Sequence, residues 1–265
     1  MAAAAHGGVS AAMPCPAPRL LALGDGAWTV EFGDAIDPAL HGRVMGLAQA
    51  VRAAWATGAA PWRAVVDVVP TFRSLTVHYE PLACDGMALG DALLELAQQT
   101  TARPSAGRCW RLPACFAPAM APDLDALAAR VGLTAEAVVQ QLLAAAFRVY
   151  QIGFLPGFPY MGGVPAALQV PRLPSPRKAV PAGSIALAGG MCAVYPWVSP
   201  GGWHLVGRTP VPLFDVRRDP PALLASGDTV RWFAIDEATF ADLQARAQAG
   251  SLDVMACGSP PGGDG

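Results

Sequence analysis

Glycine and proline divide the second half of the chain into short β-type runs, and this punctuation limits the folds open to it. Residues 153–212 contain ten Gly and eleven Pro among 60 positions. Gly leaves the backbone free to turn and Pro removes a hydrogen-bond donor, so neither continues a long helix. The runs between these breaks are residues 149–154, 184–188, 193–197, 203–206 and 229–235. Short strands separated by turn residues predict a closed or nearly closed β-barrel.

The first half of the chain alternates strand and helix signals instead. The predicted strands are residues 28–32, 65–69 and 74–79. Asp37 followed by Pro38 predicts a helix start, because an aspartate cap and a proline at the first helical position both suit a helix N-terminus. Asp85 predicts the start of a second helix. This order predicts a small ferredoxin-like α+β domain whose last strand falls near residues 108–115.

A helical insert lies between the two halves. Leu124, Leu127 and Val131 recur at helical spacing, Gly132 follows as a stop signal, and Thr134 suits the cap of another helix. Small residues rich in Gly and Pro at both ends of the chain predict disorder there. The expected organisation is a disordered tail over residues 1–18, an α+β domain over 19–105, a barrel domain over 106–249 and a second disordered tail over 250–265.

Composition argues against several classes of protein. Hydrophobic residues make up 53% of the chain and charged residues 14%, and no apolar run reaches the roughly 20 residues of a membrane span. No secretory signal is predicted, so the six cysteines are expected to be reduced thiols in a cytoplasmic protein. The four histidines are scattered, which argues against a metal bound by this chain, and a net charge of −2 gives no basic surface for nucleic acid.

One long interval lacks acidic residues. Between Glu136 and Asp215 lie 78 residues without an acidic side chain, where the chain's average predicts about six. The cations of this interval are Arg148, Arg172, Arg177, Lys178 and Arg208. Guanidinium groups without carboxylates favour a site for a small anionic substrate, although an apolar barrel with a few solvated cations would give the same pattern. Arg177, between Pro176 and Pro181, is the first choice for an anion clamp because its planar fork can hold two oxygens.

Other residues of this interval give weaker signals. Trp203 and His204 are neighbours on a predicted strand, so their side chains face opposite sides and cannot line one pocket. His204 suits a general base, but a lone histidine more often satisfies a hydrogen bond. Ser184 has no histidine or aspartate at motif spacing and is not expected to be an activated nucleophile. The glycines near Gly157 match neither a Walker loop nor a dinucleotide fingerprint.

A series of ordered motifs resembles a known family. The motifs are GFLPGFPY at residues 153–160, PRKAVPAGS at 176–184, SPGGW at 199–203 and GRTP at 207–210. Together they closely resemble the family of B-type 5-oxoprolinase subunits, also called KipI or allophanate hydrolase subunit 1. The match extends back through residues 73–75 and 78–79 to Glu31 and forward through residues 214–215 to Asp228.

The resemblance implies a cyclophilin-like β-barrel behind a smaller α+β domain. It also implies a subunit of an ATP-dependent amidohydrolase that opens 5-oxoproline to L-glutamate, with ATP shared with a partner subunit. The partners would be a larger subunit of the C type and a third subunit of the A type. On this interpretation the proton-handling residues are Asp123 and His204, and the substrate-binding residues are Arg177, Arg208, Phe154, Phe158, Ser184, Tyr195 and Trp203.

The chain departs from the family's usual residues at three places. Residues 117–121 replace a glycine-containing run, Leu142 stands where a histidine is usual, and Met191 stands where a glutamine is usual. These apolar replacements slightly favour a second interpretation, a regulatory module that inhibits a sensor histidine kinase as one family member does. A third interpretation is a carboxyltransferase-type domain, which would require a biotin carrier.

Overall fold

The computed structural model describes residues 17–101 and 107–259, which divide into two compact units. The units separate at the gap between these ranges, except that residues 70–72 group with the second unit. The domain boundary predicted at residue 105 lies outside the described residues, as does nearly all of the tail predicted over residues 1–18. Within the described ranges, each helix is too short or not apolar enough to span a bilayer.

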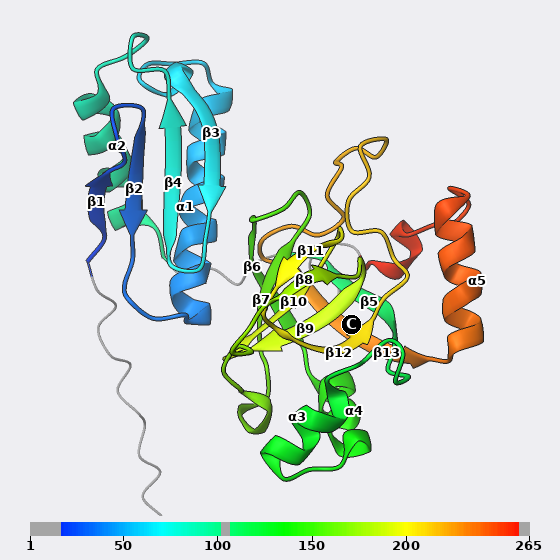
Figure 1. Cartoon of the computed structure of the whole chain (residues 1–265). Coiled ribbons are helices and arrows are strands. Elements are labelled where there is room, and N and C mark those ends of the chain that lie inside the picture. The colour runs from blue at the N-terminus through cyan, green and yellow to red at the C-terminus, as the bar shows by residue number, and fades with distance from the viewer. Residues whose placement is uncertain (1–16, 102–106, 260–265) are drawn as a thin grey trace, which may run out of the picture. The chain divides into compact units, whose positions relative to one another are not determined.

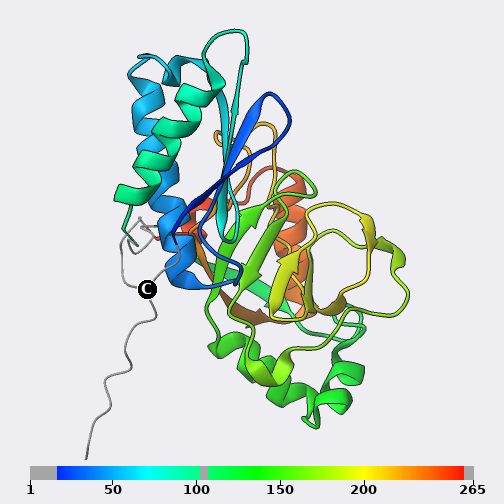
Figure 2. The same cartoon turned by 90° about the vertical axis from the view of Figure 1, so that its left-hand side faces the viewer.

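The first unit is a four-stranded sheet with two helices on one face (Figures 1 and 2). The strands in sheet order are β1 (Arg19–Ala22), β2 (Ala27–Glu31), β4 (Ser74–Tyr79) and β3 (Val65–Pro70). The helices are α1 (Pro38–Ala56) and α2 (Gly86–Gln99), with the short η1 (Trp62–Ala64) before β3. Side chains from the sheet and from the helices, among them Val30, Leu47 and Leu93, form one fully buried core. The buried residues of α1 include Leu40, Val44, Leu47 and Val51, which are three or four positions apart and so lie on one face of the helix.

Both predicted helix starts in this unit are confirmed. The Asp37 carboxylate accepts hydrogen bonds from the N–H groups of Ala39 at 2.7 Å and Leu40 at 3.1 Å. The Asp85 carboxylate accepts one from Met87 at 2.9 Å. These bonds satisfy N–H groups that have no partner within the helix.

The predicted fourth strand of this sheet is wrong. Residues 108–115 were expected to supply it, but the fourth strand is β1, which pairs antiparallel with β2 from Arg19↔Glu31 to Ala22↔Trp28. β1 is mostly exposed and does not alternate between buried and exposed residues. Its sequence therefore lacks the two-residue period on which strand prediction relies.

The second unit contains a closed barrel, as the glycine and proline pattern predicts (Figure 1). Its seven strands, in barrel order, are β10 (Met191–Val194), β7 (Pro159–Gly162), β6 (Phe147–Ile152), β13 (Thr229–Ile235), β5 (Cys109–Cys115), β12 (His204–Arg208) and β9 (Ser184–Ala188). β9 pairs with β10 to close the ring. β5 and β13 run parallel, with Cys109 opposite Thr229 and Cys115 opposite Ile235, and the other barrel pairs are antiparallel. Side chains such as Leu112, Leu187 and Val206 fill the interior.

Shorter elements surround the barrel. They are the paired strands β8 (Arg177–Val180) and β11 (Ser199–Gly201), the helices α3 (Leu124–Val131), α4 (Ala135–Ala144) and α5 (Glu237–Gln248), and the turns η2 (Ala166–Leu168) and η3 (Met255–Cys257). α3 and α4 lie together at one end of the barrel (Figure 1). Gly132 ends α3 with a left-handed φ of 71°, and the Thr134 hydroxyl caps α4 by accepting from Ala137 N–H at 3.1 Å. Both of these boundaries were predicted.

The disordered tail predicted from residue 250 is wrong for residues 250–259. Val254 is buried, Gly258 forms a β-bridge with Trp110, and Ser259 donates its N–H to the Cys109 carbonyl at 2.8 Å. A Cβ on Gly258 would lie 2.8 Å from the Trp110 ring, so the small residue serves close packing. Glycine in this segment suggested disorder, but at position 258 it allows close packing against Trp110. Residues 260–265 lie outside the described residues.

The cysteines agree with the prediction of reduced thiols. The five among the described residues, Cys84, Cys109, Cys115, Cys192 and Cys257, are all free. Complete burial raises the pKa of the Cys192 thiol, so this side chain remains a neutral part of the core. Cys15 lies outside the described residues.

Candidate functional site

An aromatic cluster lies on the outer face of the barrel. Along β9, Ile185 and Leu187 point into the barrel core, whereas Ala186 and Ala188 point outward, as the two-residue period of a strand requires. β10 and β12 continue this outer face with Ala193 and Leu205. Small outward side chains leave room for bulky rings above them, and the cluster includes Phe158, Tyr195 and Trp203.

A cavity of about 430 Å³ opens among these rings. It is lined by Phe154, Phe158, Tyr160, Arg172, Leu173, Pro176, Tyr195, Pro200, Gly201, Gly202 and Trp203. Four residues proposed from the sequence thus meet here: Phe154, Phe158, Tyr195 and Trp203. Tyr160, Arg172 and the glycines were not singled out. The alternation of small and large residues on β9 and β10 is the sequence signal that could have located this wall.

The rings contact one another mostly in edge-on geometry, although Phe158 and Tyr160 are tilted at 55°. Phe158 is 5.1 Å from Tyr195 and 5.4 Å from Phe154 between ring centroids, with interplanar angles of 89° and 82°. Tyr160 lies 4.9 Å from Phe158 and 6.0 Å from Trp203. Edge-to-face contacts at these distances are favourable and fix the orientation of each ring. The cavity is therefore walled by rings that contact one another.

Two phenol groups supply hydrogen-bond donors to this cavity. Tyr195 is only 2% exposed, and its hydroxyl has no hydrogen-bond partner among the residues that the structure describes. This hydroxyl lies against Gly201, where a Cβ would come within 2.2 Å of it. Burial raises the pKa of both Tyr160 and Tyr195, so both hydroxyls stay protonated and can donate at neutral pH.

Arg172 brings a positive charge to the same cavity. Its guanidinium carbon lies 5.8 Å from the centroid of the Trp203 ring, within the range of a cation–π contact. The side chain is exposed and forms no ion pair with any residue in the described ranges. Sequence reasoning counted Arg172 among the cations of the acid-free interval but did not distinguish it from the others.

Arg177, the first choice for an anion clamp, is occupied by an ion pair. Its guanidinium donates to Asp123 Oδ1 at 2.5 Å, and the other carboxylate oxygen accepts from Leu205 N–H at 2.7 Å. The Asp123 N–H in turn donates to the Leu205 carbonyl at 3.0 Å. Asp123 thus joins the start of α3 to β12 and neutralises Arg177, and neither side chain lines the cavity.

His204 and Ser184 lie in the barrel wall. His204 is buried, and its Nε2 atom is 3.0 Å from the Pro171 carbonyl oxygen. Pro171 directly precedes Arg172, so His204 holds the loop that carries this cation. Ser184 is 2% exposed and does not line the aromatic cavity. Trp203 does line it and His204 does not, in agreement with the prediction that they face opposite sides.

Arg208 belongs to a second cavity of about 270 Å³. This cavity is lined by Ala182, Gly183, Val194, Tyr195, Pro196, Arg208, Thr209, Pro210, Val211, Pro212, Leu213, Gln244, Ala247 and Gln248. Arg208 Nε donates to the Ala182 carbonyl at 2.7 Å, and its guanidinium lies 5.6 Å from the Phe240 ring centroid on α5. Burial lowers its pKa, but a guanidinium stays charged. Tyr195 forms part of both cavities.

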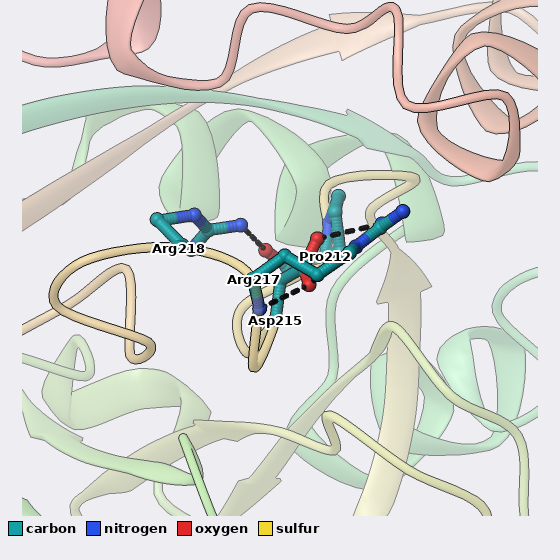
Figure 3. Close-up of polar contacts among 4 residues, drawn as sticks. All are labelled: Pro212, Asp215, Arg217 and Arg218. Atoms are coloured by element: carbon teal, nitrogen blue, oxygen red, sulfur yellow. Dashed lines mark hydrogen bonds and ion pairs between the residues drawn. The ribbon is translucent and has the colours of Figure 1, made fainter.

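A loop of paired charges borders the second cavity (Figure 3). Arg217 donates to both Asp215 carboxylate oxygens, from Nε at 2.9 Å and from Nη2 at 2.8 Å. Arg218 donates to the carbonyl of Pro212, a cavity-lining residue, at 3.1 Å. The hydrogen bonds from Arg217 lower the pKa of Asp215 to about 2. The Asp215 carboxylate is therefore engaged within its own loop.

The three departures from the family's usual residues lie outside the lining of both cavities. Leu142 is fully buried in the barrel core. Met191 packs against the aromatic cluster from outside the cavity. Residues 117–121 form the turn before α3, where Met120 Sδ lies 4.0 Å from an Arg208 nitrogen. These three replacements therefore contribute to packing around the site and not to the lining of either cavity.

Comparison with known proteins places this geometry in a family. The family model described as carboxyltransferase domain, subdomain C and D, matches residues 18–224. The B-type subunit of 5-oxoprolinase from Bacillus subtilis (strain 168) is 33% identical over 229 residues, which cover 81% of this chain and 92% of that protein. The protein of the same name from Escherichia coli O157:H7 is 39% identical, covering 63% of this chain and 77% of that protein.

Solved structures show the same fold. The crystal structure of TTHA0988 is 35% identical with a TM-score of 0.68, and the match covers 79% of this chain. This chain spans about 40% of the length of TTHA0988. The K. lactis urea amidolyase structure matches 92% of this chain with a TM-score of 0.70, although the chain spans only 16% of that protein. At 18% identity, this second likeness is one of fold alone.

Proposed function

The chain belongs to the family of B-type 5-oxoprolinase subunits, within the class of carboxyltransferase subdomains C and D, and on that premise we propose that it is a subunit of an ATP-dependent 5-oxoprolinase. In this reaction water is added across the ring amide of 5-oxoproline to give L-glutamate, and ATP hydrolysis drives the step. The observation that carries the proposal is the match over 92% of the length of the B-type subunit from Bacillus subtilis.

The aromatic cavity supports a small cyclic substrate. Its volume of about 430 Å³ falls within the range of roughly 300–1,000 Å³ typical of small-molecule sites. Its walls are mostly apolar, and its polar side-chain groups are few: the hydroxyls of Tyr160 and Tyr195, the indole N–H of Trp203 and the guanidinium of Arg172. A small ring with a carboxylate and an amide carbonyl has matching chemistry, because aromatic rings pack its faces while donors contact its oxygens.

The partner subunits and ATP are part of the same proposal. The word subunit in the names of the curated relatives implies other chains, and TTHA0988 carries the matching region within a longer polypeptide. We assign the role of that additional region to a larger subunit of the C type, with a third subunit of the A type completing the complex. ATP is then bound together with these partners, because the sequence shows no recognisable nucleotide loop.

The structure changes the roles that we propose for Asp123 and His204. Both side chains bond within the chain, Asp123 to Arg177 and His204 to the Pro171 carbonyl, and neither lines the aromatic cavity. We therefore propose that they position β12 and the loop before β8, and that proton transfer falls to groups on the partner. Each subunit alone would then lack part of the catalytic machinery.

Reconstitution tests this proposal. The chain is co-expressed with the larger and third subunits from its own host, and glutamate formation from 5-oxoproline is measured with and without ATP. We expect ATP-dependent glutamate release from the complex and none from the purified single chain. A complex that stays inert with 5-oxoproline and ATP would overturn the proposal. Turnover by the single chain would overturn the part of the proposal that assigns proton transfer to the partner subunits.

The regulatory interpretation is tested in the same preparation. The departures at residues 117–121, Leu142 and Met191 were the sequence features that favoured it, and all three lie outside the cavity linings. We therefore keep the enzyme as the primary proposal. Inhibition of autophosphorylation of a sensor kinase from the same host, together with an inert reconstituted complex, would reverse this order.

A further inference from the structure

We propose that Arg172 and Tyr195 form the recognition pair of the aromatic cavity, and that the ligand is a small ring bearing one carboxylate and one carbonyl oxygen. Arg172 would bind the carboxylate and the Tyr195 hydroxyl would donate to the carbonyl. This inference rests on the proposed function, because it specifies how the same site would select its substrate.

Arg172 is the cation of the acid-free interval that lines this cavity. Arg177 is neutralised by Asp123, and Arg208 lies in the second cavity with its Nε bonded to the Ala182 carbonyl. Arg172 instead lies over the Trp203 ring, with 5.8 Å between its guanidinium carbon and the ring centroid. A guanidinium oriented by an aromatic face keeps its N–H groups free for a planar carboxylate, which it can bind through two hydrogen bonds.

The loop that carries Arg172 is held on both sides. His204 Nε2 lies 3.0 Å from the Pro171 carbonyl oxygen, and Leu173 N–H donates to the Gly202 carbonyl at 2.8 Å. The residues before and after Arg172 are thus both tied to the segment that includes β12. The backbone at Arg172 is therefore held in position. This favours ligand binding, because less conformational entropy is lost when the side chain becomes ordered.

The Tyr195 hydroxyl supplies a directional donor. The tyrosine is 2% exposed, yet its hydroxyl has no partner among the described residues and lies against Gly201 in the cavity wall. Among the described residues, this hydroxyl is not one of the buried unpaired groups, so it is accessible from the cavity and can donate to an acceptor atom of a ligand. Charge contributions from Arg172 act on the pKa of both Tyr160 and Tyr195, which places the guanidinium and the phenols in one electrostatic environment.

The test is binding of three probes to the full chain, measured by titration calorimetry or ligand-detected NMR. The probes are 5-oxoproline, 2-pyrrolidinone, which lacks the carboxylate, and proline, which lacks the ring carbonyl. We expect Arg172→Gln to weaken 5-oxoproline and proline by at least about tenfold and to leave 2-pyrrolidinone unchanged. Tyr195→Phe should weaken 5-oxoproline and 2-pyrrolidinone by a similar factor and spare proline.

Matched controls separate recognition from folding. Lys178→Gln removes an exposed cation of the same interval that does not line the cavity, and it should leave all three affinities unchanged. Arg172→Lys keeps the charge and should restore only part of the affinity. Thermal unfolding of each variant checks that the fold is intact.

The results also distinguish this inference from the proposed function. An active reconstituted complex whose KM for 5-oxoproline is unchanged by Arg172→Gln would overturn the recognition pair and leave the function standing. The recognition pair would also be overturned if the variants lost affinity equally for all three probes, or if the full chain bound none of the probes. If the reconstituted complex is inactive but the full chain still binds carboxylate-bearing probes in an Arg172-dependent way, the proposed function would be overturned and the recognition pair would stand.

Discussion

The carboxylate of Asp123 binds Arg177, with 2.5 Å between Oδ1 and the guanidinium Nη2. These residues are 54 positions apart, and their pairing joins the start of α3 to β8. The second carboxylate oxygen accepts from Leu205 N–H on β12, so one side chain connects three elements of the barrel unit. The cation that looked best suited to binding a ligand anion therefore has an internal anion.

The Asp123–Arg177 ion pair predicts that changes at these residues alter the stability of the chain but not its affinity for 5-oxoproline. Asp123→Ala would leave the buried Leu205 N–H and Arg177 unpaired, and should lower the free energy of unfolding by about 2–3 kcal/mol. Arg177→Lys keeps the charge and should cost about 1 kcal/mol or less. Chemical unfolding and 5-oxoproline binding are measured on the same preparations. Unchanged stability combined with a loss of binding would instead make Arg177 the anion clamp.

Gly201 should be required for the position of Tyr195. A Cβ at residue 201 would lie 2.2 Å from the Tyr195 hydroxyl oxygen, so Gly201→Ala must displace this ring. We expect a lower melting temperature and at least about tenfold weaker 5-oxoproline binding. Gly190→Ala is the matched control, because its Cβ would meet nothing nearer than 3.6 Å. Equal binding by the two variants would contradict the assigned role of the tyrosine.

We expect Phe154 to lower the stability of the chain slightly and to strengthen ligand binding. It has a left-handed φ of 71° and is 65% exposed, so a large side chain adopts an unfavourable conformation while burying little surface. Because asparagine tolerates this conformation, Phe154→Asn should leave stability unchanged or raise it by up to about 1 kcal/mol. Binding of 5-oxoproline should weaken several-fold because a cavity wall is lost.

The neighbouring ring provides the comparison for Phe154. Phe158 is 2% exposed, and Phe158→Ala should destabilise the chain by about 3–5 kcal/mol. A large loss of stability in Phe154→Asn as well would show that the exposed ring is structural. Chemical denaturation of the two variants under one set of conditions measures both effects.

The Asp215 loop predicts an acid titration. The pKa of Asp215 is lowered from 3.8 to about 2, chiefly by hydrogen bonds from Arg217. Because the folded value is the lower one, the pairing stabilises the loop above the ordinary value and is lost as pH falls from about 3.8 to about 2. Carbon-13 NMR of the carboxyl group should report this low value. Arg217→Gln should return it toward 3.8, whereas Arg218→Gln should change it little.

The parts of the fold that were predicted have local causes. Asp37, Asp85, Gly132 and Thr134 mark helix ends because capping depends on neighbouring backbone groups. β9 and β13 were predicted with their observed bounds. β1 was missed because it is mostly exposed, and β8 because its charged residues show no alternation. The ordered segment after residue 250 depends on contacts with distant Trp110 and Cys109, which no local pattern reports.

The candidate site was predicted in part for a similar reason. The motifs led to Phe154, Phe158, Tyr195 and Trp203, and these side chains line one cavity. The sequence could not show which cation of the acid-free interval faces that cavity. The choice between Arg172 and Arg177 depends on Asp123, which lies far away along the chain and approaches one of them only in the folded barrel.

The parallel pairing of β5 with β13 also determines when the barrel can form during synthesis. β5 ends at Cys115 and β13 begins at Thr229, so the ribosome must add more than a hundred residues before the two strands can meet. The other neighbour of β5 is β12, which is also made late. Both edges of β5 therefore stay open on the nascent chain, and open edges promote aggregation. The last helix of the first unit ends at Gln99, so this unit can fold well before β13 is made. We expect the nascent chain to need chaperones most between the synthesis of β5 and the synthesis of β13.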